Sequence, residues 1–271
     1  MSIAAPREVP ESFYFGSPKK PLFGCYHAPQ SRVHRNCGVV LCYPMVSEYL
    51  WTHRIYRQIA VRLSMAGFPV LRFDYYGCGD SGGEGEEGGI RQWCTDISAA
   101  TDQVKERCYS DQVCLVGMHF GATLATLAGT QRSDVDGLVL WDPVVHGSEY
   151  LSELNVLHQQ RLFHSHGKAG SGSSTDQPRE LLGFPITDAM FAELKAVDLL
   201  AGVRRPASKT LIISSGSGVG GELLRDHLES LGTQVEVQHI PGPGSWDANR
   251  MKQVPVNTIQ AVVAWTSGVY S

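Results

Sequence analysis

Short apolar segments of strand length alternate with helix-length segments along most of the chain, and this order restricts the fold more than any other feature. The apolar segments are rich in β-branched residues and leucine, as is typical of parallel strands covered on both faces. They cover residues 38–44, 69–74, 112–117, 137–143, 209–214 and 234–240. The helix-length segments cover residues 52–65, 90–107, 120–131, 221–231 and 256–269. The alternation predicts an α/β fold in which a mostly parallel sheet carries helices on both faces.

Two regions depart from this alternation. Residues Phe13–Phe15 and Leu22–His27 flank the turn-rich stretch GSPKKP and predict an antiparallel hairpin, which brings the expected strands to eight. From about 144 to 203 we expect no strand. We interpret this interval as a helical lid, with helices at 149–163 and near 188–199 joined by a mobile, poorly ordered loop.

Length, charge and cysteine usage limit the class of protein. A chain of 271 residues suits one domain spanning 1–271 that includes the lid insertion. The net charge of −4 and the absence of a basic run argue against a nucleic-acid partner. Seven cysteines without a C-x-x-C pair, no signal peptide and no apolar stretch of membrane-spanning length predict a cytoplasmic protein that does not enter a membrane.

The segment VCLVGMHFGATLA, from Val113 to Ala125, has the pattern of a strand that passes through a tight turn into a helix. Gly117-Met118-His119-Phe120-Gly121 matches the nucleophile-elbow pattern G-x-S-x-G, except that His119 stands at the serine position. An elbow lifts one side chain above the sheet, where backbone N–H groups can hold an oxyanion. The sequence therefore predicts an elbow whose usual nucleophile is absent.

Several stretches carry a family resemblance. LRFDYYGCGDSGG at 71–83 resembles the D-x-x-G-x-G-x-S loop of serine aminopeptidase-like hydrolases, and the element order resembles the α/β-hydrolase fold. The stretches 42–81, LVLWDPVV at 138–145 and LLGFP at 181–185 are similar to hydrolase-like proteins associated with exosortase or natural-product gene clusters. The resemblance implies a subgroup in which the elbow serine is often replaced.

A hydrolase of this fold also needs an acid after a late strand and a histidine after the last one. The loop 214–218 has no carboxylate, and the loop PGPGSWDANR after the last strand has no histidine, while His239 lies inside that strand. A Ser–His–Asp triad in the ordinary arrangement is therefore excluded. Asp142, at the end of the strand beside the elbow strand, is the candidate acid. Equally, Asp142 can cap the turn that begins at Pro143.

His119 has four interpretations. It can act as a general acid or base, because imidazole titrates near neutrality. It can attack through a ring nitrogen and form an acyl-imidazole. It can activate Ser245, with Asp142 or Asp247 orienting its ring, in a triad with exchanged roles. Finally, it can line the pocket without taking part in chemistry.

Further residues are candidates for the pocket around His119. The backbone N–H of Phe120, together with that of Met45 or Val46, would form an oxyanion hole. His53 either reaches the pocket or belongs to a polar cluster at a helix start, and Trp246 comes from the last loop. The remaining histidines do not have metal-ligand spacing, and the glycine-rich stretch 77–89 lacks a phosphate-binding fingerprint, so we expect neither metal nor cofactor.

These observations predict an atypical α/β-hydrolase-fold enzyme that lacks a Ser–His–Asp triad. Its substrate would be a small molecule or peptide with an acyl, ester or amide group. Its reaction would be hydrolysis, acyl transfer or a proton-transfer step such as epimerisation or cyclisation. The alternative is a non-catalytic hydrolase-like protein that binds a ligand or interacts with a carrier protein. The sequence leaves the oligomeric state open.

Overall fold

The computed structural model describes residues 9–45, 47–166, 180–201, 204–216, 219–242 and 254–270, with the side chains of 164–166 and 219 excepted. The described residues form an eight-stranded sheet in the order β1-β2-β4-β3-β5-β6-β9-β10, which is parallel from β4 to β10 and antiparallel at β1 and β2. Its strands are β1 (Glu11–Ser17), β2 (Lys20–His27), β3 (Gly38–Cys42), β4 (Val70–Phe73), β5 (Val113–Met118), β6 (Gly137–Trp141), β9 (Lys209–Ser214) and β10 (Gln234–His239). The expected strands and the N-terminal hairpin are confirmed.

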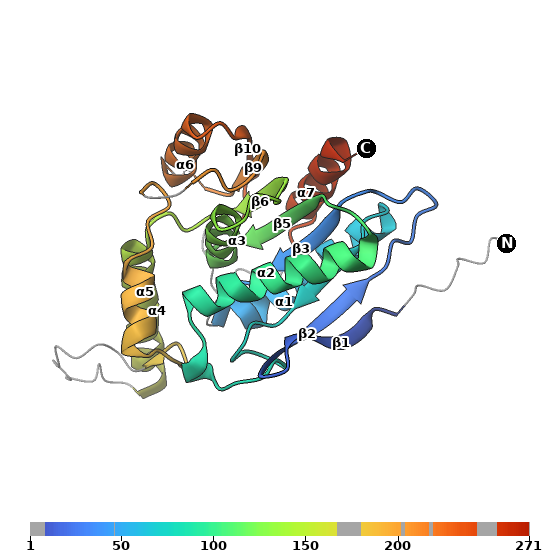
Figure 1. The fold of residues 1–271 in the computed structure, drawn as a ribbon. Helices are drawn as coiled ribbons and strands as arrows, with labels where there is room; N and C mark the ends of the chain where they lie inside the picture. The colour runs from blue at the N-terminus through green and yellow to red at the C-terminus, as the bar shows by residue number, and fades with distance from the viewer. Residues whose placement is uncertain are drawn as a thin grey trace.

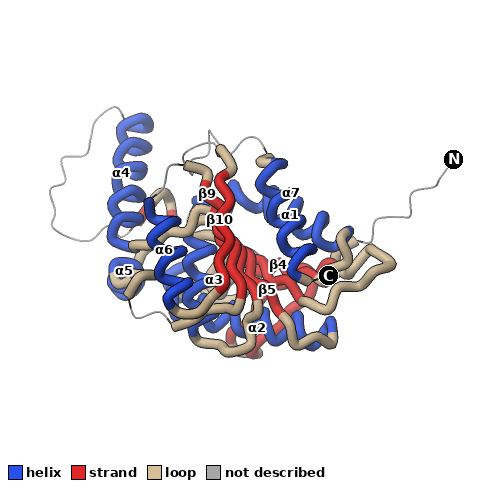
Figure 2. Tube along the Cα trace, turned by 90° about the horizontal axis from the view of Figure 1, so that it is seen from above, coloured by secondary structure: helices blue, strands red, loops and turns tan. Residues whose placement is uncertain are grey.

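Helices cover both faces of the sheet, as expected. In Figure 2, α1 (Ser47–Met65) and α7 (Val256–Val269) lie on one face, while α2 (Ile90–Cys108), α3 (Phe120–Thr130) and α6 (Val219–Ser230) lie on the other. A short 3-10 helix, η1 (Gly85–Glu87), precedes α2. On α1, Ile55, Ile59 and Leu63 recur every four residues and are buried against the sheet. This is the α/β-hydrolase fold.

The segment between β6 and β9 leaves the sheet and returns to it, at the left of Figure 1. It contains α4 (Gly147–His166) and α5 (Asp188–Lys195), near the two expected helices. The expectation of no strand here is wrong, because β7 (Glu180–Leu181) pairs with β8 (Phe184–Pro185). Leu182 and Gly183 both have positive φ, as a tight hairpin turn requires. Most of the loop expected to be mobile lies outside the described residues.

Helix α1 begins at Ser47, five residues before the expected start at residue 52. Glu48 therefore lies in its first turn, where the N-terminal end of a helix favours a negative charge. His53 lies in the second turn, so it does not belong to the helix start, and that interpretation of its role is wrong.

The register of the parallel strands aligns their carboxyl ends. Cys42 is opposite Gly117, Met118 is opposite Trp141, and Trp141 is opposite Ile213. The loops that follow β3, β5, β6 and β9 consequently meet at one edge of the sheet, which is where ligands bind in open α/β sheets.

Candidate active site

His119 occupies the turn between β5 and α3 with φ 50° and ψ −120°, a strained backbone conformation for a residue other than glycine. Its N–H donates to the carbonyl oxygen of Trp141 over 2.8 Å, which joins the elbow to the end of β6. The expected elbow is present, with histidine at its tip.

Two glycines permit this turn. A Cβ atom at Gly117 would collide with the carbonyl oxygen of Gly121, and one at Gly121 would collide with the carbonyl oxygen of Cys42. The colliding atoms are backbone atoms of packed elements, so they cannot move aside as the end of a side chain would. The spacing of these glycines therefore reflects close packing between α3 and the ends of β3 and β5.

Tyr56 joins the same strand ends from the other face. Its buried hydroxyl donates to the carbonyl oxygen of Cys42 and accepts a hydrogen bond from the N–H of Met118 over 3.0 Å. Because Tyr56 belongs to α1, this helix is fixed to the residue that precedes His119.

Glu48 is the direct partner of His119. The Nδ1 atom of His119 lies 2.8 Å from each carboxylate oxygen of Glu48. Only 5% of the Glu48 side chain and 12% of the His119 side chain are exposed to solvent. The pair is thus a buried acid–imidazole contact, and it orients the ring through Nδ1.

Tyr150, on α4, completes this cluster. Its hydroxyl donates to Oε1 of Glu48 over 3.0 Å. Its ring stacks on Phe120, with centroids 5.1 Å apart, and meets the His119 ring edge-on at 5.3 Å. The inserted segment therefore contributes a buried side chain to the elbow.

Opposing effects act on the protonation of His119. Burial alone lowers the pKa of its imidazole, but the charge and hydrogen bond of Glu48, helped by Glu153 and Asp142, outweigh burial and raise the pKa above its usual value. Burial, together with the charge of Glu48, raises the pKa of Tyr150 well above that of an ordinary tyrosine. Tyr150 is therefore a neutral donor over the whole physiological range.

A cavity of about 340 Å³ opens beside His119. One wall is α4, which contributes Glu149, Tyr150 and Glu153, and the others come from the segment after β6 and from α6. Val144, Val145 and Leu223 make part of its surface apolar. The space suits a small organic group next to the imidazole.

Asp142, the expected acid, has another partner. Its Oδ1 accepts a hydrogen bond from the N–H of Ser215 over 2.7 Å, and its backbone has a positive φ of 45°. This contact joins the ends of β6 and β9, so the carboxylate of Asp142 bonds to a distant strand end and not to the turn that begins at Pro143. Its charge still acts on His119 through space.

The other candidate residues are distributed as follows. Phe120 is buried at the start of α3, and Met45 is buried before α1. His53 stacks on Tyr43, its Nδ1 lies 3.5 Å from that hydroxyl, and burial lowers the pKa of its ring. Neither Met45 nor His53 is among the described residues that line the cavity. Val46, Ser245, Trp246 and Asp247 lie outside the described residues.

Sequence reasoning missed Glu48 and Tyr150. A signal for Glu48 was available, because Ser47 followed by an acidic residue after a strand is typical of a helix N-terminus. Tyr150 had no comparable signal, since only the packing of α4 over the elbow brings it to Glu48.

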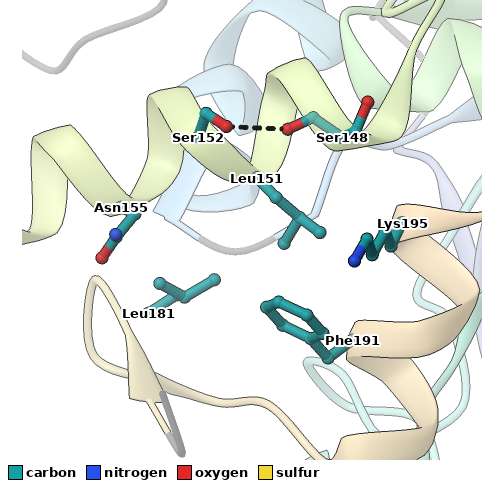
Figure 3. A pocket seen from close by; sticks show the side chains of 7 residues that line it. All are labelled: Ser148, Leu151, Ser152, Asn155, Leu181, Phe191 and Lys195. Atoms are coloured by element: carbon teal, nitrogen blue, oxygen red, sulfur yellow. Dashed lines mark hydrogen bonds between the residues drawn. The ribbon is translucent and has the colours of Figure 1, made fainter. Parts of the chain in front are cut away.

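A second cavity of about 300 Å³ lies between α4, β7 and α5 and does not include His119 (Figure 3). Leu151, Leu181 and Phe191 give it an apolar lining, with Lys195 at one side. The residues of α4 that face it differ from those that face His119, so α4 separates the two cavities.

The described part of the chain offers neither a metal-ligand cluster nor a membrane span. Its His, Cys, Asp and Glu side chains do not form a group of three or more that could hold a metal ion. Among its helices, none combines the length and apolar character needed to cross a bilayer.

The family follows from the sequence match. A family model described as serine aminopeptidase, S33, matches residues 38–206, from β3 to the segment before β9. The chain belongs to this S33 family. It is therefore a member of the α/β-hydrolase superfamily. The elbow of this S33 chain carries His119 where the G-x-S-x-G pattern has serine.

Solved structures agree with the fold of this S33 chain. A carboxyl esterase from Bacillus coagulans is 16% identical, with a TM-score of 0.67 over 97% of this chain and 100% of that one. An esterase from Pyrococcus furiosus is 15% identical, with a TM-score of 0.68 over 96% and 90%. Est1E from Butyrivibrio proteoclasticus is 14% identical, with a TM-score of 0.64 over 94% and 97%. No curated protein matches the chain. Family and fold are those of a hydrolase-type enzyme or a related protein.

Proposed function

We propose that this chain is an acid–base enzyme on the α/β-hydrolase fold, in which His119 is the catalytic group and Glu48 orients and charges it. The observation that carries the proposal is the 2.8 Å contact between Nδ1 of His119 and the Glu48 carboxylate. With the Nδ1 proton held by Glu48, the lone pair of the neutral ring lies on Nε2. That nitrogen takes the proton of a substrate C–H, a water or an alcohol.

The charges around His119 support transfer of a proton in both directions. When Nε2 accepts a proton, the buried carboxylate of Glu48 stabilises the imidazolium that forms. The same imidazolium then returns the proton to a leaving group or to another face of a carbanion. The start of α3 at Phe120 supports a further role for the elbow, because N–H groups at a helix N-terminus favour the negative charge of an oxyanion or enolate.

The substrate class follows from the fold and the family resemblance. We propose a small molecule or peptide with an acyl, ester or amide group, which undergoes hydrolysis, acyl transfer or a tailoring step such as epimerisation or cyclisation. Natural-product biosynthesis in the cytoplasm, with a carrier protein as partner, is the setting that the resemblance to gene-cluster hydrolase-like proteins favours. Direct attack by His119 on an acyl group is the covalent version of this proposal.

Solvent exchange tests the proposal on small compounds of the expected chemical class. The protein would be incubated in D₂O with a panel of N-acetylcysteamine thioesters, simple esters and short peptide amides, and products followed by mass spectrometry. We expect deuterium incorporation next to a carbonyl, or product formation, with the wild type. We expect a loss of about a hundredfold or more with His119→Ala. Asp142→Asn is the control, because asparagine keeps the acceptor for the N–H of Ser215.

Three outcomes would contradict the proposal in different ways. Equal turnover by the wild type and His119→Ala would show that His119 takes no part in the reaction. A tightly copurified ligand without conversion of any panel member would favour a non-catalytic binding protein. Labelling of Ser245 by a fluorophosphonate would favour the triad with exchanged roles, whereas the proposal expects no labelling.

A further inference from the structure

We propose that Tyr150, on the inserted helix α4, is a positioning residue that controls how strongly the Glu48–His119 pair holds its proton. Any effect of Tyr150 on turnover rests on the proposed function, whereas its effect on the protonation of the Glu48–His119 pair does not. Helix α4 then contributes a side chain that acts on the Glu48–His119 pair, in addition to forming a wall of the cavity.

Among the described residues, the Tyr150 hydroxyl makes one hydrogen bond, and it lies at the centre of the site. Its side chain is buried, and its hydroxyl donates to Oε1 of Glu48 over 3.0 Å. The stacked ring of Phe120 and the edge of the His119 ring hold the phenol in place. Both neighbours belong to the elbow, so the direction of the hydroxyl is set by the same turn that presents the histidine.

The hydrogen bond from Tyr150 to Glu48 determines in which direction Tyr150 shifts the protonation of His119. A neutral donor stabilises a carboxylate in its charged form and disperses its negative charge. The hydroxyl of Tyr150 therefore weakens the attraction between Glu48 and the proton on His119. Without this hydroxyl the carboxylate would attract that proton more strongly, and the pair would stay protonated to a higher pH.

Other titratable groups among the described residues surround the pair. The charges of Asp142 and Glu153 act on His119, Tyr56 interacts with Glu48, and His146 and Glu149 line the same cavity as His119. Replacing Tyr150 by phenylalanine changes none of these groups and keeps the ring that packs on Phe120. The substitution thus isolates the hydroxyl.

Histidine titration by NMR tests the inference on the substrate-free protein. With imidazole-labelled histidine, we expect the midpoint of His119 to shift upward in Tyr150→Phe. In a Glu48→Gln background, the same substitution should leave the midpoint of His119 where Glu48→Gln alone puts it. Leu151→Ala, which loosens α4 on its other side, is expected to lower the melting temperature without moving the midpoint.

A second probe keeps the test decisive if the phenylalanine variant folds poorly. Incorporation of 3,5-difluorotyrosine at position 150 makes the hydroxyl a stronger donor, so the midpoint of His119 should move downward. An unchanged midpoint in a folded Tyr150→Phe protein, or an equal shift in both Glu48 backgrounds, would overturn the inference. An active His119→Ala protein would overturn the proposed function while leaving this titration result intact.

Discussion

The Nδ1 atom of His119 lies 2.8 Å from both carboxylate oxygens of Glu48, a residue 71 positions earlier in the chain. The acid comes from the first turn of α1, beside the elbow strand, and not from the loops after the late strands. The usual order of functional groups in this fold places the acid after the elbow. Here the imidazole stands on the elbow and the acid precedes it.

Removing the charge of Glu48 should deprive His119 of its main stabilising partner. We expect Glu48→Gln to lower the pKa of His119, because burial then acts without an opposing carboxylate, and to reduce turnover about a hundredfold. NMR titration and steady-state kinetics measure the two effects. Asp142→Asn removes a more distant charge and should lower the pKa less. An equal fall in both variants would contradict the assignment of Glu48.

Restoring serine at the elbow should not restore a serine hydrolase. In His119→Ser, the hydroxyl would face Glu48, and the sequence has no histidine after His239 to act as its base. We expect hydrolysis of p-nitrophenyl acetate not to rise above the wild-type level and fluorophosphonate labelling to remain absent. A rise in esterase activity of about tenfold or more would show that a base for this serine exists elsewhere.

The packing of the elbow predicts a large cost for one added methyl group. We expect Gly121→Ala to lower the free energy of unfolding by about 1–3 kcal/mol, because its Cβ would collide with backbone atoms of Cys42 and Tyr43. Gly268→Ala, in α7, is the matched control. Nothing lies within 4 Å of its added Cβ, and it should stabilise the protein by up to about 1 kcal/mol. Urea unfolding distinguishes the two.

A buried histidine outside the site should make stability depend on pH. Arg72 donates from Nε to Nε2 of His27 over 3.0 Å, which requires a neutral imidazole. Burial and then the charge of Arg72 lower the pKa of His27 from 6.5 to about 4. Between these values the unfolded chain binds a proton that the folded chain does not, so this group reduces stability as pH falls from about 6.5 to about 4.

His27→Gln checks this pH dependence, because a glutamine carbonyl accepts from Arg72 without titrating. We expect a smaller loss of stability between pH 6.5 and pH 4 in denaturant titrations of this variant. His34→Gln, at an exposed position, should leave the wild-type slope unchanged. A similar slope in the wild type and His27→Gln would show that other groups dominate acid unfolding.

The fold followed from periodicity, since each expected strand of the parallel sheet agrees with the observed one to within two residues at either end. The elbow followed from the spacing of Gly117 and Gly121 around His119. The partners of His119 could not be predicted from such patterns. Glu48 was missed because its helix was expected to start too late, and Tyr150 was missed because contacts made by an inserted segment depend on tertiary packing. Asp142 was predicted as a strand-end acid, but the sequence could not show that its carboxylate accepts a hydrogen bond from the N–H of Ser215.

The hydroxyl of Tyr56 links two elements of the candidate site. By bonding to Cys42 and Met118, it fixes the helix that supplies the acid to the strand that carries the histidine. This cross-link between helix and strand helps to keep the distance between Glu48 and His119 constant. The wall of the cavity formed by α6, which includes Leu223, is not part of the cross-link, so its side chains can differ without changing the distance between the carboxylate and the imidazole.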